Sequence, residues 1–348
     1  MKPHVQTMMM IGLGLGTTFT FSSSHWFLAW VGLEINTLAI LPMMTQSFHP
    51  RAIEAAIKYF LIQTTAAAMI LFASVTNAWI TGQWSLELMH HPFPSTLMIM
   101  ALALKMGLAP LHAWMPEVLQ GLDYNTGLIM ATWQKMAPFC LLVQMNPSNT
   151  NILLVFGLAS AFLGGWGGLN QVQLRKVLAY SSIAHIGWMM LVIHFTPSLA
   201  FLALILYYIM TFSLFAQFKI SNLFNINSLA MSWSKYPITS YLMPFILLSL
   251  GGLPPFTGFM PKWLIVQELT KQDLVPLAIL AVISALLSLY FYLRITLTMI
   301  MTMSPHNSYS LLPWRHPAYQ LAYPLAITFV LTILLLPMTP TLLLLIIF

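Results

Sequence analysis

The sequence predicts an all-α polytopic membrane protein with about eleven transmembrane helices. Three observations support this prediction: 59% of the 348 residues are hydrophobic, only 6% are Asp, Glu, Lys or Arg, and long apolar windows follow one another with short connections. An ordinary soluble domain carries roughly 25% charged residues. The chain has far too few charges for a soluble fold, so its apolar windows are expected to cross a bilayer.

The predicted helices are windows of roughly 20 mostly apolar residues, the length that crosses the hydrocarbon core. Short segments rich in Pro, Asn and Ser separate them, such as SFHPRA at 47–52 and NPSNTN at 146–151, and these are typical of turns. The connections are short, so no soluble domain is expected. The windows lie near residues 4–22, 25–45, 57–80, 95–115, 127–145, 151–171, 177–195, 198–219, 238–260, 274–300 and 322–346.

The basic residues predict the orientation of these helices. Eleven spans place the two termini on opposite sides, and only Lys271 of the 13 Lys and Arg residues lies in a loop opposite the N-terminus. Nine lie on the N-terminal side, which is a strong positive-inside bias. The N-terminus is therefore expected to face the compartment in which the chain is made. The nine are Lys2, Arg51, Lys58, Arg175, Lys176, Lys219, Lys235, Arg294 and Arg315.

Charge and cysteine usage exclude several classes of function. The net charge of +6 comes from basic residues that stand singly or in pairs, without the basic stripe of a nucleic-acid-binding protein. The single cysteine, Cys140, excludes an intrachain disulfide and a CxxC metal or iron–sulfur motif. GLGLG at 12–16 lies inside an apolar window with no preceding strand, so it predicts close helix packing and not dinucleotide binding.

Four charged residues lie inside apolar windows, where no loop explains them: Glu34, Lys105, Lys135 and Lys262. An ionisable residue at that depth is costly and normally faces a partner or a water-filled interior. Structural ion pairs between helices are one interpretation of these charges. Three cations and one anion cannot all neutralise one another, however, so we prefer to interpret them as titratable groups of a functional site.

Two windows carry the same interruption. GLAPLHAWMPE at 107–117 and GLPPFTGFMPK at 252–262 are 145 residues apart and share five of eleven residues, which suggests two related halves. Proline removes a backbone N–H and clashes with the preceding turn. The carbonyls that it frees must line a wet cavity or be buried in protein. Broken helices at matching places in two repeats are typical of the ion sites of transporters.

Several segments of the chain resemble one known family. They are similar to the vertebrate-type chain 2 family of mitochondrial NADH:ubiquinone oxidoreductase, respiratory complex I, and the similarity covers most of the chain to about residue 265. The segments are HWFLAWVGLEINTLAILP (25–42), LALKMGLAPLHAWMPEVLQGL (102–122), TWQKMAPF (132–139), RKVLAYSSIAHIGWM (175–189) and GLPPFTGFMPKW, which begins at residue 252.

The resemblance implies an antiporter-like membrane-arm subunit, related to Mrp-type antiporters, with two inverted repeats that each contain a proline-broken helix. A single antiporter-like transmembrane domain would span residues 1–348. Its first repeat would lie roughly at 25–145, its second roughly at 151–300, and a C-terminal helix roughly at 322–346.

The resemblance also implies a role for each charge inside a window. Glu34 would pair with Lys105 and modulate its proton affinity, Lys135 would be the connecting lysine, and Lys262 would be the terminal lysine beside the second break. The four would form a proton relay, because moving a carboxylate changes the proton affinity of a buried lysine. One departure is that Lys262 aligns with Glu117 in the repeat and not with Lys105.

Two histidines are further candidates for the relay. His112 lies in the first break and His185 lies in AYSSIAHIGW. An imidazole at a broken helix could bridge lysines that are too far apart for direct transfer. A core histidine with satisfied hydrogen bonds is the alternative interpretation of each.

The preferred function is a proton-translocating core membrane subunit of complex I, which couples NADH oxidation and ubiquinone reduction to proton pumping through the Glu/Lys relay. A stand-alone Mrp-like cation/proton antiporter and a structural membrane scaffold are the alternatives. Glu34 is the one clear acid inside a window, and a hard cation such as Na⁺ needs oxygen ligands. The antiporter alternative is therefore less favoured.

The resemblance implies a subunit of the H⁺-translocating NADH:ubiquinone reductase that carries no redox centre itself. No cofactor or metal is expected on this chain, whereas NADH, FMN, iron–sulfur clusters and ubiquinone are expected elsewhere in the complex. Expected partners are neighbouring antiporter-like subunits, small core membrane subunits and lipids such as cardiolipin, without nucleic acid. The expected location is the mitochondrial inner membrane, with the N-terminus on the matrix side and the C-terminus on the intermembrane-space side.

Overall fold

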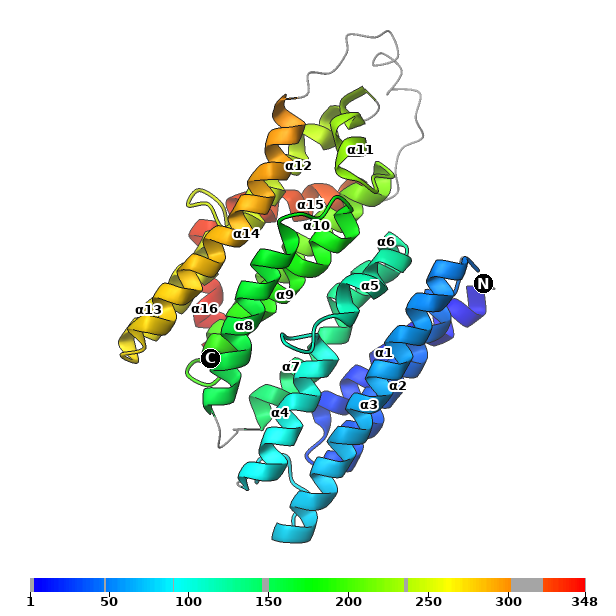
Figure 1. Cartoon of the computed structure of the whole chain (residues 1–348), viewed down its shortest axis with the longest axis vertical. Helices are drawn as coiled ribbons and strands as arrows, with labels where there is room; N and C mark the ends of the chain where they lie inside the picture. Colours follow the sequence, from blue (N-terminus) through cyan, green and yellow to red (C-terminus); the bar gives the residue numbers. More distant parts are fainter. Residues whose placement is uncertain are drawn as a thin grey trace. The chain divides into compact units, whose positions relative to one another are not determined.

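The computed structural model describes residues 3–46, 48–89, 91–145, 150–234, 237–301 and 322–347. Every regular element in these ranges is a helix, as Figure 1 shows. The all-helical prediction is therefore confirmed for the part of the chain that the structure describes. Three of the basic residues that predict the orientation, Lys2, Lys235 and Arg315, lie outside these ranges.

The chain divides into two compact units, Met1–Ser160 and Ala161–Phe348, and the boundary falls inside α8 (Thr150–Gly168). The helices before it are α1 (Pro3–Ser22), α2 (Trp26–Met44), α3 (Pro50–Thr81), α4 (Pro92–Met106), α5 (Trp114–Gly121), α6 (Tyr124–Ala131) and α7 (Trp133–Gln144). The helices after it are α9 (Leu174–Val192), α10 (Pro197–Ile220), α11 (Ile226–Ala230), η1 (Ser232–Ser234), α12 (Pro237–Gly251), α13 (Phe259–Lys271), α14 (Val275–Met301), α15 (Ala322–Leu334), η4 (Leu336–Met338) and α16 (Thr339–Ile347).

Five of the described helices are long and apolar enough to cross a membrane by themselves: α2, α3, α8, α10 and α14. The pair Pro324–Leu334 and Leu336–Leu344, bent by 71°, is a sixth candidate span. These helices coincide with six predicted windows and confirm a multi-pass helical membrane protein. The window 127–145 is divided between α6 and α7, whereas the windows 95–115 and 238–260 contain most of α4 and α12, and α5 and α13 begin only at their last two residues.

The helices α4 and α12 end in the same way. Gly107 and Gly252 both have left-handed backbone angles, with φ of 75° and 81°. In both, the N–H of the following leucine bonds to a carbonyl five residues earlier, at 2.9 Å and 3.3 Å. This hydrogen-bond pattern closes a helix at a glycine, because glycine adopts the left-handed angles without a steric penalty on Cβ. The Gly–Leu sequence that the two segments share is therefore the stop signal of both helices.

The helices α1 and α2 approach each other closely at glycines. A Cβ added to Gly16 would lie 2.4 Å from Oδ1 of Asn36 and 2.8 Å from the carbonyl of Gly32. A Cβ added to Gly32 would lie 2.6 Å from the side chain of Thr20. Nothing lies within 4 Å of the corresponding position on Gly14. The structure confirms that GLGLG mediates helix packing and identifies Gly16 as the glycine that the contact requires.

We predict that Gly16→Ala destabilises the protein by about 1–3 kcal/mol, the usual cost of overpacking a close contact. Gly14→Ala, two residues away on the same helix, is the matched control and should change stability little. Thermal unfolding of the protein extracted from its native membrane in mild detergent measures both. Equal melting temperatures for the two variants would contradict the close α1–α2 contact.

Candidate functional site

The first unit encloses a small polar cavity that two lysines line. Lys105 and Lys135 are only 6% and 4% exposed, and both face this cavity. About 10 Å³ of the cavity is open to a water-sized molecule. The uncharged polar side chains that also line it are Asn36, Thr37, Tyr59, Gln63, Trp114 and Gln134. The structure therefore brings together two of the predicted site residues.

The break after α4 places Lys105 in the cavity. The helix ends just beyond this residue, so the carbonyls of its last turn lack helical donors. Nε2 of Gln63 donates to the carbonyl of Lys105 at 3.5 Å, and Nε1 of Trp114 donates to the carbonyl of Leu104 at 3.2 Å. Side chains thus satisfy the broken backbone without the ammonium group. Nζ of Lys105 itself bonds to no atom of the described residues.

Lys135 follows an interruption that the sequence did not predict. The helix α7 begins directly after Thr132, whose hydroxyl donates to the carbonyl of Leu128 at 2.7 Å. Within α7, Pro138 lacks the N–H that would bond to the carbonyl of Gln134. The turn that carries Lys135 therefore has polar backbone that regular helical bonds do not satisfy.

Glu34 lies on α2 beside the cavity and is not bonded to Lys105. The hydroxyl of Thr37, one turn along the same helix, is shared between the backbone carbonyl of Glu34, at 2.9 Å, and Oε2 of Glu34, at 3.1 Å. The carboxylate still attracts the Lys105 cation electrostatically. This arrangement differs from the direct pair that the resemblance implies, because a hydroxyl on its own helix holds the carboxylate.

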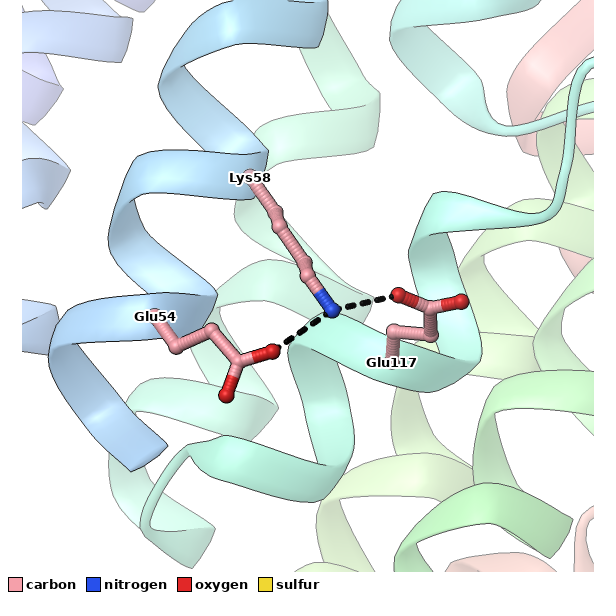
Figure 2. A network of polar contacts seen from close by, with 3 residues as sticks. All are labelled: Glu54, Lys58 and Glu117. Atoms are coloured by element: carbon pink, nitrogen blue, oxygen red, sulfur yellow. Dashed lines mark hydrogen bonds and ion pairs between the residues drawn. The ribbon is translucent and has the colours of Figure 1, made fainter. Parts of the chain in front are cut away.

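Figure 2 shows a separate cluster of three charged side chains in the first unit. Nζ of Lys58 on α3 lies 2.8 Å from a carboxylate oxygen of Glu54, one turn earlier, and 2.8 Å from one of Glu117 on α5. All three side chains are exposed, and exposed pairs of this kind contribute little to stability. The cluster connects α5, the second half of the broken helix, to α3.

In the second unit, Lys262 caps the helix that the break interrupts. Its Nζ donates to the carbonyls of Leu250 and Gly251, at 3.3 Å and 2.9 Å. These carbonyls form the C-terminal end of α12, which carries partial negative charge and favours a nearby cation. The Lys262 side chain also lies across Gly252, where an added Cβ would be 3.0 Å from Cδ and from Nζ. Lys262 and Glu117 are aligned in the repeat, but they have different partners.

The two candidate histidines each have a backbone partner. Nδ1 of His112 lies 3.3 Å from the carbonyl of Pro110 inside the first break, and His112 does not line the lysine cavity. Nδ1 of His185 lies 2.7 Å from the carbonyl of Ser181, and its ring stacks on Tyr207 with centroids 5.4 Å apart. These contacts fix both rings, as they would fix a core histidine.

Sequence reasoning did not single out Tyr59, Gln63 or Gln134. The hydroxyl of Tyr59 donates to Oε1 of Gln134 at 3.4 Å, and both side chains line the cavity with Lys105 and Lys135. Tyr59 and Gln63 are four residues apart, so they share a face of α3. Two polar residues at this spacing inside an apolar window were the available signal.

The cavity is suited to proton transfer. Two ammonium groups that line one enclosed space would repel each other, so the arrangement favours a state in which one lysine is charged and the other is neutral and can accept a proton. Among the described residues, no group of three His, Cys, Asp or Glu side chains is placed to hold a metal ion.

Comparisons with known proteins point to one family. Residues 23–288 match the family described as NADH:quinone oxidoreductase/Mrp antiporter, TM, and residues 289–343 match NADH dehydrogenase subunit 2 C-terminus. The chain is 61% identical over 340 residues to NADH-ubiquinone oxidoreductase chain 2 of Tetraodon nigroviridis and 58% identical over 340 residues to that of Gadus morhua. Each alignment covers 98% of both chains.

Two solved structures share the fold. A chain of respiratory complex I from Thermus thermophilus with bound aureothin has a TM-score of 0.81 and 27% identity, covering 96% of this chain and 79% of that chain. A chain of the Mrp complex from Dietzia sp. DQ12-45-1b has a TM-score of 0.79 and 15% identity, covering 96% of this chain and 75% of that chain. At its identity, the second likeness shows the fold alone.

We predict that Gly252→Ala destabilises the protein by about 1–2 kcal/mol, because a Cβ is strained at a left-handed position. The same Cβ would displace Lys262 from the end of α12. Gly251→Ala is the matched control, since its added Cβ would have no neighbour closer than 3.7 Å. Thermal unfolding in mild detergent distinguishes the two, and an unchanged melting temperature for Gly252→Ala would be inconsistent with the cap described above.

Proposed function

The chain belongs to the NADH-ubiquinone oxidoreductase chain 2 family, and from this premise we propose that Glu34, Lys105, Lys135 and Lys262 form its proton relay. The chain is an antiporter-like, proton-translocating membrane subunit of complex I. The observation that carries the proposal is the enclosed polar cavity that Lys105 and Lys135 share.

Glu34 sets the charge state of the cavity in this proposal. Its carboxylate accepts a hydrogen bond from Thr37. Glu34 directly follows Leu33 in the sequence, and Leu33 lines the cavity. A rotation that brought Glu34 to Lys105 would favour the ammonium form, and its return to Thr37 would release the proton toward Lys135. Thr37 thus provides the second resting position that such a switch needs.

Lys262 is the proposed terminal group, within the second unit. Its ammonium group is stabilised by the carbonyls at the end of α12, so it can hold a proton without a carboxylate partner. His112 and His185 are proposed as additional carriers because each is an imidazole in a polar segment. In each histidine, Nδ1 contacts a backbone carbonyl. The other ring nitrogen, Nε2, would therefore carry the proton.

We further propose the complete topology that the sequence predicts: eleven spans in one domain over residues 1–348, with two inverted repeats. The matching ends of α4 and α12 support the repeats. The nine basic residues on the N-terminal side support an N-terminus in the matrix and a C-terminus in the intermembrane space of mitochondria. We propose that the redox cofactors and ubiquinone bind to other subunits of the complex. Cardiolipin and neighbouring antiporter-like subunits would surround this chain.

A stand-alone cation/proton antiporter is the second candidate, because the fold is also that of the Mrp complex chain. Native electrophoresis of gently solubilised membranes separates the two functions. Co-migration of the chain with a large particle that has inhibitor-sensitive NADH:quinone activity supports the complex I subunit. A small particle without that activity would favour the antiporter.

We predict that Lys105→Ala and Lys135→Ala slow proton transfer through the assembled complex roughly a hundredfold, as expected when a proton-transferring group is removed. Proton uptake into proteoliposomes, measured together with NADH:quinone turnover, gives the number of protons pumped per NADH. Both variants should lower this number or the coupled turnover.

Lys271→Ala is the control, because this lysine lies at the end of α13, is exposed and bonds to Glu268 at 3.2 Å. It should pump as the unmodified complex does. Normal assembly and unchanged pumping by both Lys105→Ala and Lys135→Ala would refute the relay.

A further inference from the structure

Two buried hydrogen-bond donors in the lysine cavity lack an acceptor. Nζ of Lys105 and Nε2 of Gln134 are both buried, and neither bonds to any atom of the described chain. Both residues line the same cavity. A buried donor without an acceptor is costly, so two such donors in one enclosed space indicate an acceptor between them.

The size of the cavity fits one water molecule. About 10 Å³ is open to a water-sized molecule, close to the lower limit of about 10–15 Å³ that one water needs. A water oxygen accepts two hydrogen bonds and its two hydrogens can be donated, which matches two unbonded donors in a polar space. An apolar molecule would leave both donors unsatisfied.

Most of the other polar side chains around the cavity already have partners. The amide of Gln63 donates to the carbonyl of Lys105, and the hydroxyl of Thr37 donates to Glu34. Oδ1 of Asn36 has no hydrogen-bond partner among the described residues, but it is an acceptor, and it lies against α1, where it would be 2.4 Å from a Cβ on Gly16. Among the uncharged side chains of the lining, Gln134 is therefore the one with a buried donor, Nε2, that lacks a partner and can bond to a water.

Tyr59 fixes the orientation of the Gln134 amide. Its hydroxyl donates to Oε1, which leaves Nε2 as the atom available to a water. At 3.4 Å this bond is long for an O–H donor, so the hydroxyl can also reach a water in the cavity. The Tyr59 ring is held against Trp114, with centroids 5.9 Å apart, and Trp114 in turn bonds to the broken end of α4.

We propose that Tyr59 and Gln134 are positioning residues that hold one water between Lys105 and Lys135, the water through which the proton passes. This inference rests on the proposed relay. In the step, an N–H bond of the Lys105 ammonium breaks as the water oxygen takes that proton. An O–H bond of the same water breaks as neutral Lys135 takes the other proton, so Lys105 ends neutral and Lys135 ends charged.

Through Tyr59 and Gln134, the broken helix can also influence proton transfer between the two lysines. Trp114 begins α5, contacts Tyr59 and bonds to the end of α4. A shift of α5 relative to α3 would move Trp114 away from the Tyr59 ring. The freed ring could then turn and release the Gln134 amide from its orientation toward the water. Movement at the break would then open or close transfer between the lysines without moving either lysine.

The test uses assembled complex I that carries Gln134→Leu or Tyr59→Phe in this chain. Gln134→Leu removes both amide atoms, and coupled turnover should fall about tenfold, the effect of losing one hydrogen bond in the transfer path. Tyr59→Phe removes a single oxygen and should reduce it about threefold. In both, the ratio of turnover in H₂O to that in D₂O should rise, because proton transfer becomes limiting.

Gln144→Leu is the matched control on the same helix, since Gln144 bonds to the carbonyl of Phe21 and does not line the cavity. It should leave the turnover and the isotope ratio unchanged. If Gln134→Leu prevents assembly, Tyr59→Phe decides the question, because the aromatic ring and its contact with Trp114 are retained.

The results separate this inference from the relay itself. If Lys105→Ala is impaired while assembled Gln134→Leu and Tyr59→Phe turn over with the isotope ratio of the unmodified complex, the positioning pair is overturned and the relay stands. If Lys105→Ala and Lys135→Ala both assemble and pump normally, the relay fails and the inference fails with it. A raised isotope ratio in both positioning variants, absent from Gln144→Leu, supports the inference.

Discussion

The structure depends on one constraint: a polar backbone group inside a membrane protein needs a partner other than bulk water. Wherever a helix stops in mid-span, its last carbonyls must find donors within the protein. Gly107 and Gly252 solve part of this problem in the same way, by turning the chain into a left-handed conformation that closes the helix. The donors for the remaining carbonyls differ between the two breaks, and this difference decides what each nearby lysine can do.

At the first break the donors are the side chains of Gln63 and Trp114. The ammonium group of Lys105 is therefore not needed as a cap, and it faces the cavity with no described partner. At the second break Lys262 itself supplies the donors. A lysine that caps carbonyls is stabilised as a cation, whereas a lysine beside a small cavity is free to exchange its proton. The same backbone break can thus support a transfer group in one unit and a holding group in the other.

The sequence was sufficient to predict the elements whose signals are local. A lysine within an apolar window is conspicuous by itself, and so is a repeated Gly–Leu followed by prolines. Tyr59 and Gln134 are 75 residues apart and uncharged, so only the three-dimensional structure reveals that they meet. The interruption at Thr132 was also not predicted, because threonine is compatible with both a helix and its end. The bond of Glu34 to Thr37 was missed for a different reason. It competes with a pair between Glu34 and Lys105, and only distances in the folded protein decide between the two.

In the proposed relay, the cavity lining has to pass a proton and not to keep it. A carboxylate between Lys105 and Lys135 would form a stable ion pair with one of them and hold the proton there. The amide of Gln134 and the phenol of Tyr59 carry no charge, so they would hold the proposed water by hydrogen bonds without favouring either lysine. The carboxylate of Glu34 is instead held at the edge by Thr37, where it can bias the lysines when it moves. Neutral groups at the centre and an acid at the margin are the arrangement that a reversible transfer requires.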